Sequence, residues 1–408
     1  MKNKVLHIAS HMGGGVGKVL SNVALHNDER YEHHIILLEK PIDTVFTDKI
    51  EDKLTIMPSL SEIIGMVIDA EIVQFDFWNH PLMAGLMHNL QGVPMRSVVW
   101  SHTAGCYYPY IKPEFVTMPD HFIFSSQYTR DNKFWTLQDL YNMTNISVVN
   151  SSGGFTETRN IPLKEHDGFN IGYVGTLGYV KLNPDFIKYC DAVSNIPNVK
   201  FVMIGRIPEP NLVLRDAKEA GIDDLFEFKG WVPYLPVELA KLDVLGYLLN
   251  PYHFGTTENA LLEAMSMSIP PIVINQCAEK YLVEHGQSGY KVHNPIEYKG
   301  AMNYLYENPT IRKKIGTNAR NRVTSNLELG NTIQKLNHVY NVVMWNNKRR
   351  IEPDLVFGKT PFDWYQAGLP PGGLGKISQY LVDSTKGSVN QWAKYYPQDE
   401  RLAELVKR

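Results

Sequence analysis

Residues 250–275 read NPYHFGTTENALLEAMSMSIPPIVIN, and this stretch decides the fold. The apolar residues that end at Asn250 predict a strand, a helix is expected from about Asn259, and PPIVIN (270–275) predicts the next strand. A strand, a helix and a second strand in this order are typical of a parallel βαβ unit. The helix start then lies at the carboxyl end of a strand, where its free N–H groups favour an anion such as a diphosphate.

The same alternation of strand and helix runs through most of the chain. Several of the strand-like runs are apolar throughout, as expected for a parallel sheet that is covered on both faces. The fold class predicted is therefore α/β, with two Rossmann-like domains in tandem. The expected strands are VLHIAS (5–10), HHIILLE (33–39), LTIMP (54–58), EIVQFDF (71–77), RSVVWSH (96–102), HFIFSS (121–126), ISVVNSS (146–152), FNIGYVGT (169–176), VKFVMIG (199–205), FEFKGWV (226–232), DVLGYLLN (243–250), PPIVIN (270–275) and GYKVHN (289–294).

The division into domains follows from TETRNIPLKEHDG (156–168), which loses hydrophobic periodicity and collects charge, Pro and Gly. This linker predicts an amino-terminal Rossmann-like domain at 1–160 and a carboxyl-terminal one at 169–345. A carboxyl-terminal extension at 346–408 is expected to pack back on the first domain. Because ligands of such sheets bind beyond the carboxyl ends of the strands, two domains that face each other would hold the site in the cleft between them.

Composition excludes several classes of protein. The 408 residues include 40 Lys and Arg and 43 Asp and Glu, so the net charge of −3 argues against a nucleic-acid binder. Residues 1–168 hold 13 basic and 19 acidic residues, so docking on anionic lipid is not indicated. The amino terminus has no apolar run long enough for a signal peptide, and the three cysteines lie far apart. We therefore expect a cytoplasmic protein.

The first expected strand is followed by HMGGGVGK (11–18), a glycine-rich loop that opens a helix. Gly14 and Gly15 let the backbone approach an anionic ligand closely. The P-loop pattern fails because Met12 and Val19 stand where Gly and Ser or Thr are required. The dinucleotide pattern fails as well, so nucleotide hydrolysis and a nicotinamide cofactor are both disfavoured; a plain tight turn is the remaining alternative.

The segment LLEAMSMSIPPIV, together with its preceding loop, resembles the retaining glycosyltransferases of the GT-B fold, family 4, and the resemblance covers roughly residues 4–340. It implies that Glu263 binds the ribose of a nucleotide-sugar donor. The family's partner glutamate, eight residues earlier, is replaced by Gly255, and Glu258 is expected to act in its place.

Further positions match the family one by one. In GYVGTLGYVKLNPDF (172–186), Lys181 matches a lysine that binds the diphosphate, and Arg206 would supply the second cation. In RSVVWSHTAG, His102 matches a histidine that lies near the reacting sugar. The resemblance implies His102, Lys181 and Glu258 as catalytic residues. It implies Gly14, Gly15, Arg206, Thr256, Thr257 and Glu263 as donor-binding residues.

The function implied is transfer of a hexosyl group from a UDP- or GDP-linked sugar to a hydroxyl of a glycan, lipid or small molecule, with retention at the anomeric carbon. No metal and no further cofactor are expected, because no cluster with metal-ligand spacing is readable in the sequence. Two alternatives stay open: a nucleotide-sugar epimerase or isomerase on the same architecture, and a binding protein that keeps the fold without activity.

Overall fold

A computed structural model describes residues 2–26, 28–41, 43–381 and 386–407. The chain forms two compact units. Unit 1 comprises Met1–Gly153, Phe254–Thr257 and Leu329–Arg408, and unit 2 comprises Gly154–His253 and Glu258–Glu328. Each unit is built around its own parallel sheet with interleaved helices, so the predicted class of two Rossmann-like domains is confirmed.

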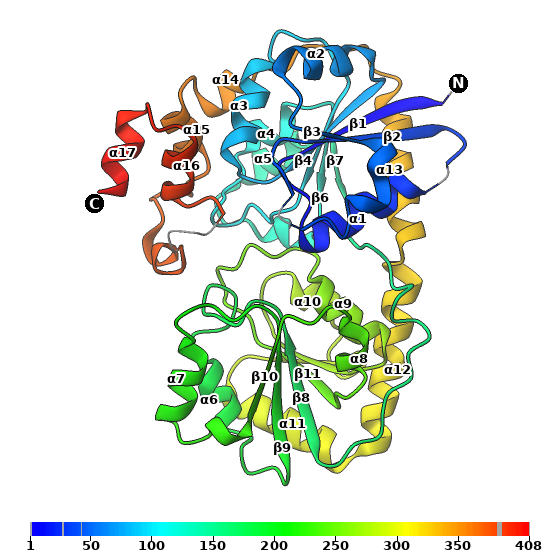
Figure 1. Ribbon diagram of the computed structural model, residues 1–408, viewed down its shortest axis with the longest axis vertical. Helices are drawn as coiled ribbons and strands as arrows, with labels where there is room; N and C mark the ends of the chain where they lie inside the picture. Colours follow the sequence, from blue (N-terminus) through cyan, green and yellow to red (C-terminus); the bar gives the residue numbers. More distant parts are fainter. Residues whose placement is uncertain (1, 27, 42, 382–385, 408) are drawn as a thin grey trace. The chain divides into compact units, whose positions relative to one another are not determined.

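Unit 1 contains a seven-stranded parallel sheet with the order β3-β2-β1-β4-β5-β6-β7 (Figure 1). Every strand expected in this part of the sequence is present. The strands are β1 (Asn3–Ala9), β2 (Tyr31–Leu37), β3 (Leu54–Ile56), β4 (Ile72–Phe77), β5 (Ser97–Ser101), β6 (His121–Phe124) and β7 (Ile146–Val148). The helices of the main body are α1 (Gly14–Leu25), α2 (Leu60–Asp69), α3 (Pro81–Asn89), α4 (Pro113–Thr117), α5 (Leu137–Asn142) and α13 (Leu329–Val343).

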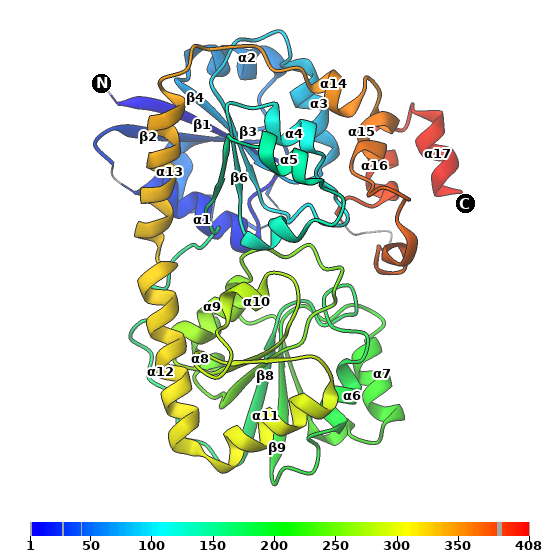
Figure 2. The same ribbon diagram turned by 180° about the vertical axis from the view of Figure 1, so that it is seen from behind.

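Successive residues of the central strand β1 pack on opposite faces of this sheet. Leu6 and Ile8 join an apolar cluster with residues of α2 and α3, whereas Val5 joins a second cluster with α1 and α13. Figure 2 shows α13 beside the sheet, on the side of α1. Burial on both faces explains why the strands of this unit are almost continuously apolar.

The carboxyl-terminal extension packs within unit 1 (Figure 1). Its helices α15 and α16 contact α3, and the Tyr396 hydroxyl donates a hydrogen bond to the Pro81 carbonyl at 2.9 Å. Trp364 and Trp392 are both buried, and Trp392 is 0% exposed. The helices of the extension are α14 (Pro353–Phe357), α15 (Pro361–Ala367), α16 (Val389–Tyr395) and α17 (Glu400–Val406).

Unit 2 contains a six-stranded parallel sheet with the order β10-β9-β8-β11-β12-β13. All six strands expected from the sequence are present. The strands are β8 (Phe169–Val174), β9 (Val199–Ile204), β10 (Phe226–Gly230), β11 (Val244–Tyr247), β12 (Pro271–Ile274) and β13 (Tyr290–Val292). The helices are α6 (Phe186–Asp191), α7 (Leu212–Glu219), α8 (Leu235–Leu239), α9 (Asn259–Ser266), α10 (Glu279–Leu282), α11 (Pro295–Glu307) and α12 (Pro309–Asn326).

The limits of the units differ from the ranges predicted for the domains. The chain enters unit 2 at Gly154, and α13 belongs to unit 1 although the sequence placed residues up to 345 in the second domain. The reason is that Leu336 and Tyr340 of α13 are buried in the apolar cluster of β1 and α1. None of the helices in the described part of the chain combines the length and the apolar character that a bilayer crossing needs.

Candidate functional site

The carboxyl edge of the sheet in unit 2 gathers most of the charged residues that the sequence singled out. Strands β8, β9, β11 and β12 are parallel, so the loops that follow them begin at the same edge. Lys181 follows β8, Arg206 follows β9, and Glu258 lies between β11 and α9. Glu258 and Lys181 are in direct contact, whereas Arg206 is exposed to solvent.

Glu258 is the centre of a buried charge cluster. It is the N-cap residue of α9 and has a left-handed backbone conformation, with φ of 49°. Its Oε2 accepts hydrogen bonds from Lys181 Nζ at 2.8 Å and from the Tyr247 hydroxyl at 2.6 Å. Its Oε1 lies 3.5 Å from Nδ1 of His253. The sequence expected Glu258 to act from the loop, and the structure places it outside the helix.

These contacts keep the Glu258 carboxylate ionised. Burial, the largest influence, would raise its pKa, but Lys181 and His253, together with the bond from Tyr247, lower the pKa of Glu258 to about 2. A carboxyl group with this pKa carries a negative charge throughout the physiological range. It can accept hydrogen bonds or stabilise a developing cation, but it has no proton to donate as a general acid.

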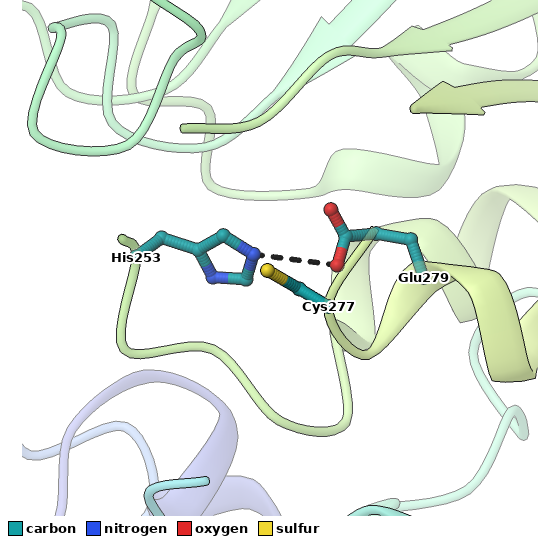
Figure 3. A group of neighbouring side chains, drawn as sticks. All are labelled: His253, Cys277 and Glu279. Carbon is teal, nitrogen blue, oxygen red and sulfur yellow. Dashed lines mark hydrogen bonds and ion pairs between the residues drawn. The ribbon is translucent and has the colours of Figure 1, made fainter. Parts of the chain in front are cut away.

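His253 lies between two buried carboxylates. Figure 3 shows its ring directed toward Glu279, at 3.3 Å between Nε2 and Oε2, with the sulfur of Cys277 beside the ring. Burial and Lys181 lower the pKa of His253, but Glu279, Glu258 and Cys277 raise it to about 10. The imidazole is therefore a buried cation that offsets the negative charges of Glu258 and Glu279.

His253, Cys277 and Glu279 also carry donor atoms of the kind that bind a metal, and these atoms lie within 4.8 Å of one another. Imidazole binds a metal only in its neutral form. Because the pKa of His253 is about 10, a proton competes strongly for the same nitrogen. In this structure the three side chains form a charge network with Glu258 and Lys181.

Two glycines shape the backbone at the ends of β8 and β9. Gly205 has φ of 134°, and a Cβ there would lie 2.0 Å from the carbonyl oxygen of Gly175. The loop that begins at Gly175 is fixed to β9, because the N–H of Leu177 donates to the carbonyl of Arg206 at 2.9 Å. This close approach of two backbones requires glycine at position 205.

Helix α9 begins at Asn259, as the sequence predicted, and the side chain of its N-cap residue Glu258 makes no capping hydrogen bond. Glu263 lies in the second turn of α9 and is half-buried. Thr256 and Thr257 belong to unit 1. The hydroxyl of Thr257 accepts a hydrogen bond from the N–H of Ser151 at 2.9 Å, so it serves local structure there.

The glycine-rich loop of unit 1 opens α1 as predicted. Gly13 is the N-cap residue, and Gly14 has φ of 57° and is exposed, while Gly15 is half-buried. The first turn of α1 contains no acidic residue, so its positive end is not neutralised locally. A Cβ at Gly17 would lie 2.8 Å from the ring of Phe46, so this glycine is required for packing.

His102 follows β5 directly and is buried in unit 1. Its Nε2 lies 3.2 Å from Oδ1 of Asp76, a residue of β4. A nearby pocket of the same unit is lined by His11, Trp78, Asn79, His80, Thr103, Pro109, Phe254, Lys386 and Gly387. The carboxyl-terminal extension thus contributes Lys386 to this pocket, with Nζ 4.9 Å from the centre of the Trp78 ring.

Sequence reasoning missed Asp76, Tyr247, His253 and Cys277. Asp76 could have been found, because an acidic residue inside the apolar run EIVQFDF needs a buried partner. His253 and Glu258 both stand in the quoted stretch, but the second carboxylate partner, Glu279, comes from α10. Tyr247 and Cys277 carry no pattern that separates them from ordinary core residues.

Comparisons with known proteins agree with this architecture. Residues 154–322, about two fifths of the chain, match the family model described as glycosyl transferases group 1. No match was found among curated proteins. Solved structures with a similar fold include a glycosyltransferase from Rickettsia africae ESF-5, with a TM-score of 0.68, 14% identity and coverage of 85% of this chain and 99% of that chain.

Anabaena Alr3699/HepE in complex with UDP is also similar, with a TM-score of 0.64, 15% identity and coverage of 84% of this chain and 100% of that chain. The lipopolysaccharide outer core galactosyltransferase WaaB has a TM-score of 0.62 and 17% identity, with coverage of 82% and 98%. At these identities the matches establish the fold, and the family match concerns unit 2. Residues 154–322 thus match the glycosyl transferases group 1 family within a chain of two Rossmann-like domains.

Proposed function

We propose that the chain transfers a hexosyl group from a nucleoside-diphosphate sugar to an acceptor hydroxyl, with retention at the anomeric carbon and without a metal. The single observation that carries this proposal is the ionised Glu258 in contact with Lys181 at the start of α9. This arrangement offers a cation and a helix start to a diphosphate, and a fixed carboxylate to the sugar that the diphosphate leaves.

In this proposal unit 2 binds the donor. The diphosphate lies at the start of α9, where Lys181 and the exposed guanidinium of Arg206 are available to it. Each charge-assisted hydrogen bond to phosphate contributes roughly 1.5–3 kcal/mol, so two cations stabilise the leaving group substantially. Glu263 binds the ribose hydroxyls from the second turn of α9. UDP, which HepE binds, is the first candidate nucleotide, and GDP is the second.

The reaction needs a stabilised leaving group and a stabilised oxocarbenium-like sugar. Glu258 has no proton to give, so its role is to accept hydrogen bonds from the donor sugar or to stabilise its positive charge. Lys181 and the helix N–H groups stabilise the departing diphosphate, whose oxygen takes the proton of the acceptor hydroxyl. His102 contacts the reacting sugar, and unit 1 binds the acceptor through the loops at its sheet edge, which include Gly14 and Gly15.

The test is a screen of UDP-, GDP- and ADP-linked sugars by thermal stabilisation, because a ligand that binds only the folded state raises the melting temperature. The stabilising donor is then incubated with an acceptor panel, and the anomeric configuration of the product is read by proton NMR. Glu263→Ala should abolish the stabilisation. Glu219→Ala, which removes an exposed carboxylate on α7, is the matched control and should retain it.

Each outcome separates the proposal from its rivals. An α-linked product from an α-linked donor supports retention, and an inverted product contradicts it. Conversion of the donor without any acceptor indicates an epimerase or isomerase. Donor binding without turnover over the full acceptor panel indicates a binding protein. If the donor stabilises the Glu263→Ala variant as much as the wild type, α9 does not belong to the donor site.

A further inference from the structure

A chain of buried polar side chains crosses the sheet of unit 1 and ends at His102. Nδ1 of His33 lies 2.9 Å from Nε2 of His7, and Nδ1 of His7 lies 3.3 Å from Oδ2 of Asp76. The other oxygen of Asp76, Oδ1, lies 3.2 Å from Nε2 of His102. All four side chains are at least nine-tenths buried. They come from β2, β1, β4 and the residue after β5, so the chain links four neighbouring strands.

The proton arrangement of this chain follows from its neighbours. The hydroxyl of Tyr340 donates to Oε1 of Gln74 at 2.7 Å, which turns the amide nitrogen of Gln74 toward Oδ1 of Asp76 at 3.0 Å. Burial alone would raise the pKa of Asp76, but the bonds from His102 and His7 hold that pKa below its usual value. Asp76 is therefore an ionised carboxylate, which only accepts hydrogen bonds.

Because Asp76 only accepts, Nε2 of His102 must carry a proton. Nδ1 of His7 lies 3.3 Å from Oδ2 of Asp76 and 3.1 Å from the amide nitrogen of Gln74. Burial and His7 lower the pKa of His33 to about 3, so its ring is neutral.

The other ring nitrogen of His102, Nδ1, takes no part in this chain. Nδ1 of His102 is buried and has no hydrogen-bond partner among the described residues. Buried polar atoms are nearly always paired, so an unpaired one at the carboxyl edge of a Rossmann-like sheet points to a ligand group. When Nε2 holds the single proton of the ring, Nδ1 accepts a hydrogen bond, which a hydroxyl can donate.

We propose that Asp76 is a positioning residue that fixes the tautomer of His102, so that Nδ1 accepts a hydrogen bond from a substrate hydroxyl. This inference rests on the proposed function, in which His102 contacts the reacting sugar. It assigns the contact to a sugar or acceptor hydroxyl and excludes a fully ionised phosphate, which has no proton to donate to Nδ1. His7 and Gln74 hold the carboxylate of Asp76 in place.

The first test is made on the wild-type protein and needs no substitution. Long-range nitrogen–proton NMR of histidine-labelled protein reports which ring nitrogen of His102 carries the proton, and His102→Gln identifies the signal. The expected result is a neutral ring that is protonated on Nε2. Protonation of His102 on Nδ1 alone would overturn the proposal, because Asp76 would then not select the tautomer.

The second test uses Asp76→Asn, which preserves shape but can donate to Nε2 and so moves the proton of His102 to Nδ1. We expect kcat to fall by about 10- to 100-fold, the range that corresponds to an unsatisfied buried hydrogen-bonding group. The donor dissociation constant should change less than about twofold, because Asp76 belongs to unit 1. The NMR signal should show the proton on Nδ1.

The matched control is His121→Asn. His121 is a buried histidine of β6 whose Nε2 lies 2.8 Å from the Ser147 hydroxyl, and it has no contact with Asp76 among the described interactions. It should lower stability without lowering kcat. Equal loss of kcat in both variants would show that Asp76 acts only through stability. Normal kcat in Asp76→Asn with a defect in His102→Gln would refute this inference alone, whereas normal kcat in both would refute the role of His102 in the proposed function.

Discussion

His253→Gln is the substitution that tests the charge cluster of unit 2 most sharply. It keeps a polar side chain but removes the buried cation between Glu258 and Glu279. The pKa of His253 rises from 6.5 to about 10 on folding, and this shift corresponds to at most about 5 kcal/mol of stability. A similar range, about 3–5 kcal/mol, is typical when one partner of a buried ion pair is removed.

The sign of the pH dependence follows from the raised pKa. A group whose pKa is higher in the folded state contributes its full stability below the unfolded value of 6.5 and loses it as pH rises through about 10. The difference in the free energy of unfolding between wild type and His253→Gln should therefore be largest at pH 6. At pH 9 most of this contribution is lost.

The assay is urea unfolding followed by circular dichroism at pH 6, 7.5 and 9. The matched control is His293→Gln, which removes an imidazole that contacts Glu297 at 2.9 Å on the surface, where the His293 side chain is 62% exposed. Exposed pairs contribute about 0–1 kcal/mol, so the control should change little at any pH. A difference for His253→Gln that is independent of pH, or that grows from pH 6 to pH 9, would refute the buried imidazolium.

Three further outcomes are expected. Lys181→Met should raise the dissociation constant for the nucleoside diphosphate by about 10- to 100-fold in calorimetry, because one charge-assisted bond is lost; an unchanged constant would place the diphosphate elsewhere. Gly205→Ala should lower the melting temperature and weaken nucleotide binding together, because the new Cβ would lie 2.0 Å from a carbonyl oxygen; wild-type values for both would contradict this close approach. Trp392→Ala should lower the free energy of unfolding of unit 1 by about 3–5 kcal/mol, because the side chain is fully buried. A decrease below about 1 kcal/mol would mean that the extension packs loosely.

The architecture could be predicted from the sequence because its signals are local. Each of the thirteen expected strands is a short apolar run with turn or loop residues at its ends, and all thirteen are present. The start of α9 at Asn259 follows from the loop before it. The placement of α13 in unit 1 could not be predicted, because its apolar face fits either domain until Tyr340 is seen to pack on α1 and β1.

Only part of the site could be predicted from the sequence, and the reason is physical. Lys181 and Glu258 could be named individually, but their contact depends on the left-handed backbone at Glu258, which no propensity favours. His253 becomes a buried cation because Glu258 of its own loop and Glu279 of α10 both approach it. Such charge networks depend on distances in the folded protein. These distances produce no periodic pattern in the sequence.

The central claim is that the carboxyl edge of the sheet in unit 2 holds a nucleoside diphosphate at the start of α9. The most direct measurement is a crystal structure of the protein with the nucleoside diphosphate that gives the largest thermal stabilisation. We predict diphosphate density within hydrogen-bond distance of Lys181 and of the first N–H groups of α9, with the ribose at Glu263. Ordered nucleotide bound elsewhere, with the start of α9 unoccupied, would contradict the account.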